Sequence, residues 1–293
     1  MTSKSKLIIP KGLDEKLFTA RYEAALQDRE KRFKLESSRL ADLQKVRIDM
    51  AAEAARANGI TVSPPSEKSV AFHKQTLKKL STLRPIHADT PSTPIDIGPP
   101  YAAALPPLSN FDGPIESKPW NNSPDPTRGE LGGVLAAWAG GQAMLQTGFV
   151  IPAFARSSGI YQVEVVASMK GIYYLHAPAY GIAEFELGLF VVFIDEVPEP
   201  SASYTATANI GSAITPFFSG GTQWDYLDNL SAAPTSEQQK DTGMSFTEKF
   251  SFTMGDAPGP IQVQVGLIQK IAATPGAIAS VDPELTIQSI SIA

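Results

Sequence analysis

The sequence of 293 residues contains no cysteine, which excludes disulfide bonds and thiolate metal sites. It contains only three histidines, His73, His87 and His176, and no two of them are close in the sequence. A zinc site needs several ligands at short, defined spacings, so this scatter argues against one. The P-loop, dinucleotide-binding, zincin and nucleophile-elbow signatures are missing as well. We therefore expect no cofactor and no motif-encoded catalytic residue, and we lean towards a protein that is not an enzyme.

A hydrolase whose residues meet only in the folded chain stays open as an alternative. Ser-His-Asp catalysis would have to be assembled around His176, because the other two histidines precede the region of predicted strands. Glu184 and Glu186 share one face of a predicted strand and could act as a carboxylate pair on a sugar. The simpler interpretation of this pair is a polar strand face.

The N-terminus has little of what a secretory signal needs. The apolar run after Lys6 ends at Ile9, and a charged segment follows directly. We expect the protein to be cytoplasmic, or to be released by a route that uses no signal peptide.

Two segments, 131–155 and 200–223, contain no charged residue. The first would be long enough to cross a bilayer as a helix of about 20 residues, but its many glycines do not suit one. Buried strands are the preferred interpretation. The alternative is a pore-forming or membrane-acting toxin in which these segments insert as a β-hairpin.

Charge is distributed unevenly along the chain. Residues 1–90 hold 18 Lys+Arg against 11 Asp+Glu, a net of +7, whereas residues 91–293 hold 7 against 19, a net of −12. A basic segment joined to an acidic body indicates docking on an anionic partner, on the body itself or on a neighbouring subunit. The positive residues alternate with acids and few aromatics accompany them, so nucleic-acid binding is not expected.

Proline and glycine are absent between Leu13 and Asn58, which predicts one helix of about 45 residues, close to 70 Å long. Apolar residues at separations of three, four or seven form a stripe along it. Surface ion pairs alone do not hold so long a helix, so the stripe must be covered. We expect it to pair with another helix in a homo-oligomer or a larger complex. The assembly residues would be Tyr22, Leu26, Phe33, Leu40 and Leu43.

A second, shorter helix is predicted between Ser66 and Arg84, so that residues 1–84 would form a helical arm. Eleven prolines between Pro85 and Pro126 then predict an extended linker, 85–130, with no room for a regular element. The remainder, 131–293, would be a separate domain.

Several segments of the 131–293 region alternate apolar and polar residues and are bounded by Gly, Pro, Asp or Ser clusters. No helical period intervenes, which favours antiparallel connections and a β-sandwich or jelly roll of eight or so strands. The fold class is therefore α+β with several domains. In its layout, this region resembles the jelly-roll binding modules of lectins, capsid proteins and toxin C-terminal domains. The resemblance carries no family motif and no functional residue.

One local cluster indicates ligand recognition: Trp224, Asp225, Tyr226, Asp228 and Asn229. Sugars are recognised by aromatic faces that stack on C–H groups while acids and amides bind hydroxyls. The two aspartates are also of a type that ligates calcium. Alternatively, the aromatic residues simply close one end of the sandwich. The function predicted from sequence is a non-catalytic binding or assembly protein with a glycan as its candidate ligand.

Overall fold

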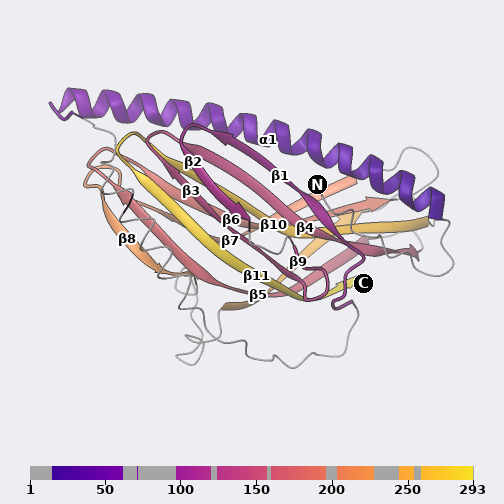
Figure 1. Cartoon of the computed structure of the whole chain (residues 1–293). Coiled ribbons are helices and arrows are strands. Elements are labelled where there is room, and N and C mark those ends of the chain that lie inside the picture. The colour runs from indigo at the N-terminus through magenta and orange to yellow at the C-terminus, as the bar shows by residue number, and fades with distance from the viewer. Residues whose placement is uncertain are drawn as a thin grey trace.

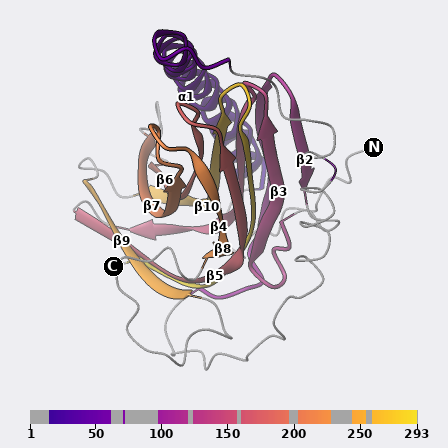
Figure 2. The ribbon, with the colours of Figure 1, turned by 90° about the vertical axis from the view of Figure 1, so that its left-hand side faces the viewer.

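The structure is a computed structural model that describes residues 15–61, 71, 97–119, 124–156, 160–195, 203–227, 244–253 and 259–292. Within these ranges the chain forms one long helix, α1 (Glu15–Ala57), and eleven β-strands. The strands build two antiparallel sheets that face each other, and α1 runs across the outside of one of them (Figures 1 and 2). The β-sandwich predicted from sequence is confirmed.

The first sheet has five strands in the order β1-β4-β10-β6-β7. Their bounds are β1 (Ala103–Asp112), β4 (Gln142–Arg156), β10 (Gly259–Ala273), β6 (Ala183–Asp195) and β7 (Ser203–Ile214). This five-stranded sheet lies under α1.

The second sheet has the order β2-β3-β11-β5-β8, and β9 also pairs with β5. Their bounds are β2 (Ile115–Pro119), β3 (Glu130–Trp138), β11 (Ile278–Ile292), β5 (Ile160–Ala177), β8 (Gly221–Tyr226) and β9 (Met244–Thr253). Strand β5 pairs with β9 through its first half and with β8 through its last six residues, so β8 and β9 follow one another along the same edge.

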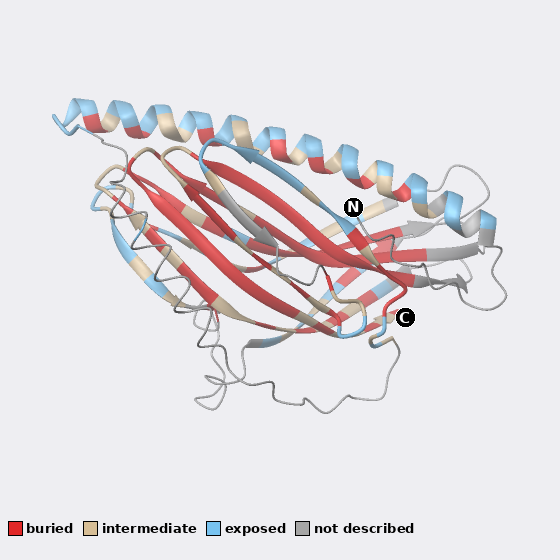
Figure 3. Cartoon of the chain, viewed as in Figure 1, coloured by how far each residue is buried: buried red, intermediate tan, exposed pale blue. Residues whose placement is uncertain are grey.

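Apolar residues of both sheets fill the space between them, as the alternating sequence requires. Figure 3 shows this core as continuous bands of buried residues along the central strands. Phe193 of β6 stacks on Phe252 of β9 across the two sheets, with ring centroids 5.2 Å apart. The uncharged segment 131–155 lies within β3, β4 and the turn between them, as the buried-strand interpretation predicted.

The prediction that residues 85–130 hold no regular element is wrong. Strands β1 and β2 lie in this segment and form an outer strand of each sheet. Proline is tolerated there because an edge strand needs fewer backbone donors and because bulges absorb the misfit. Pro106 and Pro107 sit where the β1–β4 register shifts, between Leu105 and Leu108, and Pro119 is the last residue of β2.

Helix α1 is not free-standing. Phe33 is only 5% exposed and contacts an apolar cluster on the outer face of the five-stranded sheet, which includes Met144, Phe190 and Ile268. Leu43 is 49% exposed and lies outside this contact. Tyr22, Leu26 and Leu40 pack against the same cluster, so for these three residues and Phe33 the expected partner helix is corrected to this sheet. The physical reason is that the sheet is itself apolar on its outer face, so each surface removes the other from water.

The second predicted helix lies outside the described residues apart from Ala71, which is helical. Whether the arm 1–84 and the region 131–293 fold independently stays a prediction. Among the described residues, no helix has a stretch apolar enough and long enough to cross a membrane.

Candidate ligand-binding face

The outer face of the six-stranded sheet brings two aromatic side chains together at its β5–β8 edge. Trp224 of β8 lies directly opposite Tyr174 of β5 in the antiparallel register. Directly opposed residues project from the same face, with their Cβ atoms about 4.5–5.5 Å apart. Trp224 is 59% exposed, and Tyr174 is partly exposed beside it. We call these two residues, with His176 and Thr222, the aromatic face.

Polar groups stand next to the two rings. Thr222 lies opposite His176 in the adjacent row, and the His176 Nδ1 atom is 2.8 Å from the Thr222 Oγ1 atom. Burial raises the pKa of the Tyr174 phenol further above its ordinary value, at which the hydroxyl is already protonated at neutral pH. The face therefore presents an imidazole, a hydroxyl and a phenol around an exposed indole.

A second aromatic group, which we call the end cluster, lies in the loops beyond this face. Tyr180 in the β5–β6 loop meets Phe217 and Phe218 in the β7–β8 loop, with ring centroids 5.9 Å and 6.2 Å away. The Tyr180 N–H donates to the Phe217 carbonyl at 2.7 Å, which holds the two loops together. Phe218 is 75% exposed, and Tyr180 has a positive φ of 63°, a backbone strain that often marks functional loops.

The structure separates the residues that the sequence grouped. Trp224 projects outward, whereas Asp225 lies opposite Tyr173 on the core side of the strand, where its charge adds to burial in raising the pKa of the Tyr173 phenol. Tyr226 ends β8, and its side chain is not described. Asp228 and Asn229 lie outside the described residues. Within the described ranges no three His, Asp or Glu side chains gather into a metal site, and calcium stays a prediction.

Sequence reasoning missed the partner strand of Trp224. Tyr174 and Thr222 were not predicted as site residues, and His176 was considered for zinc binding and catalysis but not for ligand recognition. The alternating pattern of β5 shows that Tyr174 and His176 share a face, but cross-strand neighbours depend on register. No local signal identifies them.

Both carboxylates of the proposed hydrolase pair are engaged in docking α1. Glu184 forms an ion pair with Arg47 of the helix. Lys270 of β10 lies 3.4 Å from Glu186 and 3.0 Å from Glu36 of the helix, measured between the ammonium nitrogen and the carboxylate oxygens. The polar face predicted as the simpler interpretation is thus the surface that receives α1.

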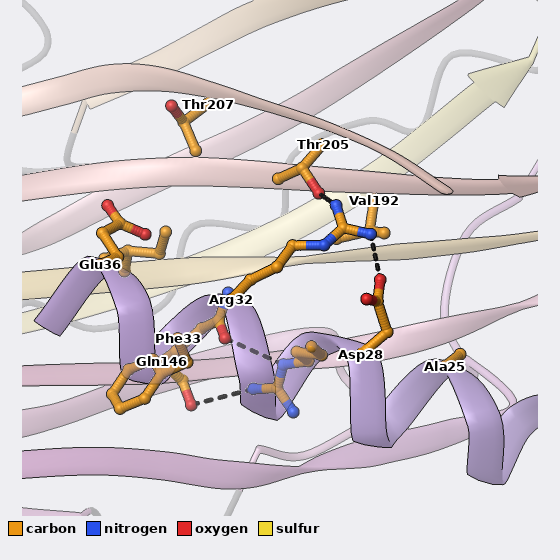
Figure 4. Close-up of a pocket in the computed structure, with 11 residues that line it drawn as sticks. Ala25, Asp28, Arg32, Phe33, Glu36, Gln146, Val192, Thr205 and Thr207 are labelled. Carbon is orange, nitrogen blue, oxygen red and sulfur yellow. Dashed lines mark hydrogen bonds and ion pairs between the residues drawn. The ribbon is translucent and has the colours of Figure 1, made fainter. Parts of the chain in front are cut away.

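The interface between α1 and the five-stranded sheet also contains polar residues near its middle. Arg29 is 4% exposed and reaches Gln146 of β4 and the Pro106 carbonyl of β1. Figure 4 shows Arg32 extending to Thr205 of β7 and to Asp28. A cavity of about 40 Å³ remains here, room for a water molecule or two but not for a ligand.

A wider open groove, about 510 Å³, lies between α1 and the edge strand β1. Phe111 and the largely buried Phe33 contribute aromatic rings, and Glu30, Lys34 and Asp112 contribute charges of both signs. Glu30 and Lys34 already bond each other at 2.8 Å. The groove therefore has less specific recognition chemistry than the aromatic face.

Comparisons with known proteins show distant likeness only. No family model and no curated protein matches the chain. Among solved structures, the enzymatically active domain of bacteriophage CBA120 tailspike protein 4 aligns at 9% identity and a TM-score of 0.23 over 62% of this chain, which spans only 19% of that protein. A family 16 carbohydrate-binding module aligns at 11% identity and a TM-score of 0.19, covering 57% of this chain and 86% of the module. TmCBM61, solved with β-1,4-galactotriose, aligns at 9% identity and a TM-score of 0.18, covering 62% and 89%. These scores are too low to support an argument about fold or function.

Proposed function

We propose that this chain is a non-catalytic binding protein whose β-sandwich recognises a glycan on the aromatic face. The observation that carries the proposal is the placement of exposed Trp224 directly opposite Tyr174, beside the hydrogen-bonded pair His176 and Thr222. An exposed indole beside a second, partly exposed ring forms a small aromatic patch on a sheet face, which is a candidate surface for ligand binding.

The chemistry of the face suits a sugar. A pyranose presents C–H groups on one side, which stack on aromatic rings, and hydroxyls at its rim, which need donors and acceptors. The imidazole of His176, the hydroxyl of Thr222 and the phenol of Tyr174 can supply both. They are fixed on strands, so little conformational entropy is lost on binding.

The strand order supports a jelly-roll form of the sandwich. The row β3-β11-β5-β8 faces the row β4-β10-β6-β7, and the chain crosses between the two sheets repeatedly, although the β6–β7 connection stays within one row. Strands β1 and β2 then extend one edge of each sheet. Such a scaffold holds a flat sheet face in place for recognition.

Glycan-array screening, followed by titration calorimetry with the best ligand, tests the proposal. We expect Trp224→Ala to weaken binding at least tenfold, about 1.4 kcal/mol. The matched control is Phe111→Ala, which removes another exposed aromatic ring from an edge strand of the opposite sheet and should leave affinity unchanged. Tyr174→Phe removes the hydroxyl and keeps the ring, so it measures what the hydroxyl alone contributes to affinity. The proposal would be refuted if the chain binds no glycan, or if it binds one with an affinity that Trp224→Ala leaves unchanged.

A further inference from the structure

The outward side of α1 carries an apolar stripe that the sheet does not cover. Leu43, Val46 and Met50 are 49%, 54% and 60% exposed and follow one another at separations of three and four. Phe33, Gln44 and Ala51 are buried on the opposite side of the helix. Figure 3 shows the two sides as alternating buried and exposed bands along α1. We call Leu43, Val46 and Met50 the outer stripe.

Opposite charges terminate the outer stripe at equal distances from its centre. Arg39 comes seven residues before Val46 and Glu53 seven residues after it, and both are exposed. One further step outward, Leu35 precedes Val46 by eleven residues and Ala57 follows it by eleven. The surface is thus complementary to its own reversed copy: cation to anion and apolar to apolar.

We propose that the outer stripe binds a second copy of this chain in an antiparallel, two-fold symmetric helix pair centred on Val46. A two-fold axis at Val46 brings Arg39 against Glu53 of the partner subunit, and the symmetry repeats this ion pair. It also sets Leu43 against Met50 of the partner subunit. An isologous contact of this kind needs one self-complementary patch and closes at two copies.

One flank of the pair carries like charges. The same symmetry places Asp42 near Asp49 of the partner subunit, and Lys45 lies between the acids along the helix. The lysine offsets part of the repulsion. The charges make dimerisation sensitive to salt, because exposed pairs are screened.

The contact is short. From Arg39 to Glu53 the helix rises about 21 Å, and one helix pair over that length buries less than the roughly 800 Å² per partner of a standard interface. The dimer is therefore weak and concentration-dependent. This association is independent of glycan binding, because the aromatic face lies on the other sheet.

Charge reversal tests the pairing directly. Sedimentation of the full chain across a concentration series gives the dimer dissociation constant. We expect Arg39→Glu and Glu53→Arg each to weaken dimerisation at least tenfold. Each variant has like charges at positions 39 and 53, and the two-fold symmetry places these like charges opposite one another at both ends of the helix pair. The double variant Arg39→Glu/Glu53→Arg restores the pairing and should return to within about threefold of the parent chain. Monomer at every concentration, or a double variant as weak as the single ones, overturns the proposal.

The absence of cysteine gives a second test. Val46→Cys places one thiol per chain at the two-fold axis, so mild oxidation should join two chains rapidly. The control is Ser38→Cys, an exposed position about a quarter turn away from the stripe. Equal rates of cross-linking for the two variants would contradict a pair centred on Val46, whatever the charge variants show. If α1 instead met another segment of its own chain here, the Val46→Cys protein would stay monomeric.

Discussion

The guanidinium of Arg29 lies over the ring of Phe190, with Cζ 5.9 Å from the ring centroid. Phe190 in turn lies across Gly148 and Gly266, which oppose each other in β4 and β10. The two glycines leave room for the ring, and the ring supports the cation that holds the helix. This layered contact joins α1 to the five-stranded sheet.

The glycine pair should be intolerant of a side chain. A Cβ atom on Gly266 would lie 2.0 Å from the Thr147 carbonyl oxygen and 2.6 Å from the Phe190 ring. The Thr147 carbonyl belongs to the backbone and cannot move aside as a flexible side chain could. We therefore expect Gly266→Ala to lower the free energy of unfolding by at least about 1–3 kcal/mol in urea titrations. Gly188→Ala is the control, since its new Cβ meets nothing closer than 3.5 Å. Equal stability of the two variants would contradict this account.

Replacement of Arg29 should show that its geometry matters as well as its charge. The side chain donates from Nε to Gln146 Oε1 at 3.0 Å, from Nη2 to the Gln146 carbonyl at 3.2 Å and from Nη1 to the Pro106 carbonyl at 2.8 Å. Burial lowers the pKa of Arg29 to about 10, so the group remains charged at neutral pH. We expect Arg29→Met to lose about 1–3 kcal/mol, because three acceptors lose their donor and the two on Gln146 are buried.

Arg29→Lys is the more discriminating variant, because a lysine keeps the charge but cannot present the planar fork. We expect it to be destabilised about as much as Arg29→Met in the same urea titration. Stability equal to that of the parent chain would show that the charge alone is sufficient.

Lys270 should contribute a stability that depends on pH. Burial lowers its pKa, but hydrogen bonds and charge from Glu36 and Glu186 outweigh this, and the pKa is raised above 10.5. A raised pKa in the folded state means that the stabilisation is complete below pH 10.5 and is lost as the pH rises through the folded value. Lys270→Met should therefore destabilise the chain by about 1 kcal/mol at pH 7, with the difference shrinking above pH 10.5.

Lys34→Met is the control for that experiment. It breaks the exposed pair with Glu30, which should contribute almost nothing. If thermal melts at pH 7 show the same loss for both variants, docking by Lys270 is not the source of the effect.

Truncation should reveal how far the β-sandwich depends on the segments before it. A chain that begins at residue 97 lacks α1 and exposes the cluster around Phe190 and Met144. We expect it to bind an apolar dye and to aggregate more readily than the full chain. A chain that begins at residue 131 also lacks β1 and β2, and we expect its unfolding in urea to lose cooperativity. Cooperative, full-chain stability of residues 131–293 would instead support an independent domain.

Much of the architecture follows from local pattern. The absence of proline and glycine between Leu13 and Asn58 predicted α1 almost to the residue, and alternation predicted that the region 131–293 consists of antiparallel strands. Trp224 was found because an indole among glycines and acids is conspicuous in any sequence. The prolines of β1 predicted a segment without regular structure, but proline forbids only a central strand and permits an edge strand with a bulge.

The sequence by itself determined that this chain makes one long amphipathic helix and a set of half-buried strands. The helical and strand periods of apolar residues depend only on residues that are close together in the sequence. Only the tertiary structure decided that a sheet covers Phe33, that Tyr174 stands beside Trp224 and that Leu43, Val46 and Met50 stay exposed. Periodicity predicts that one face of an element is buried, but it does not predict which surface packs against that face. That choice depends on strand register and on contacts between segments more than a hundred residues apart.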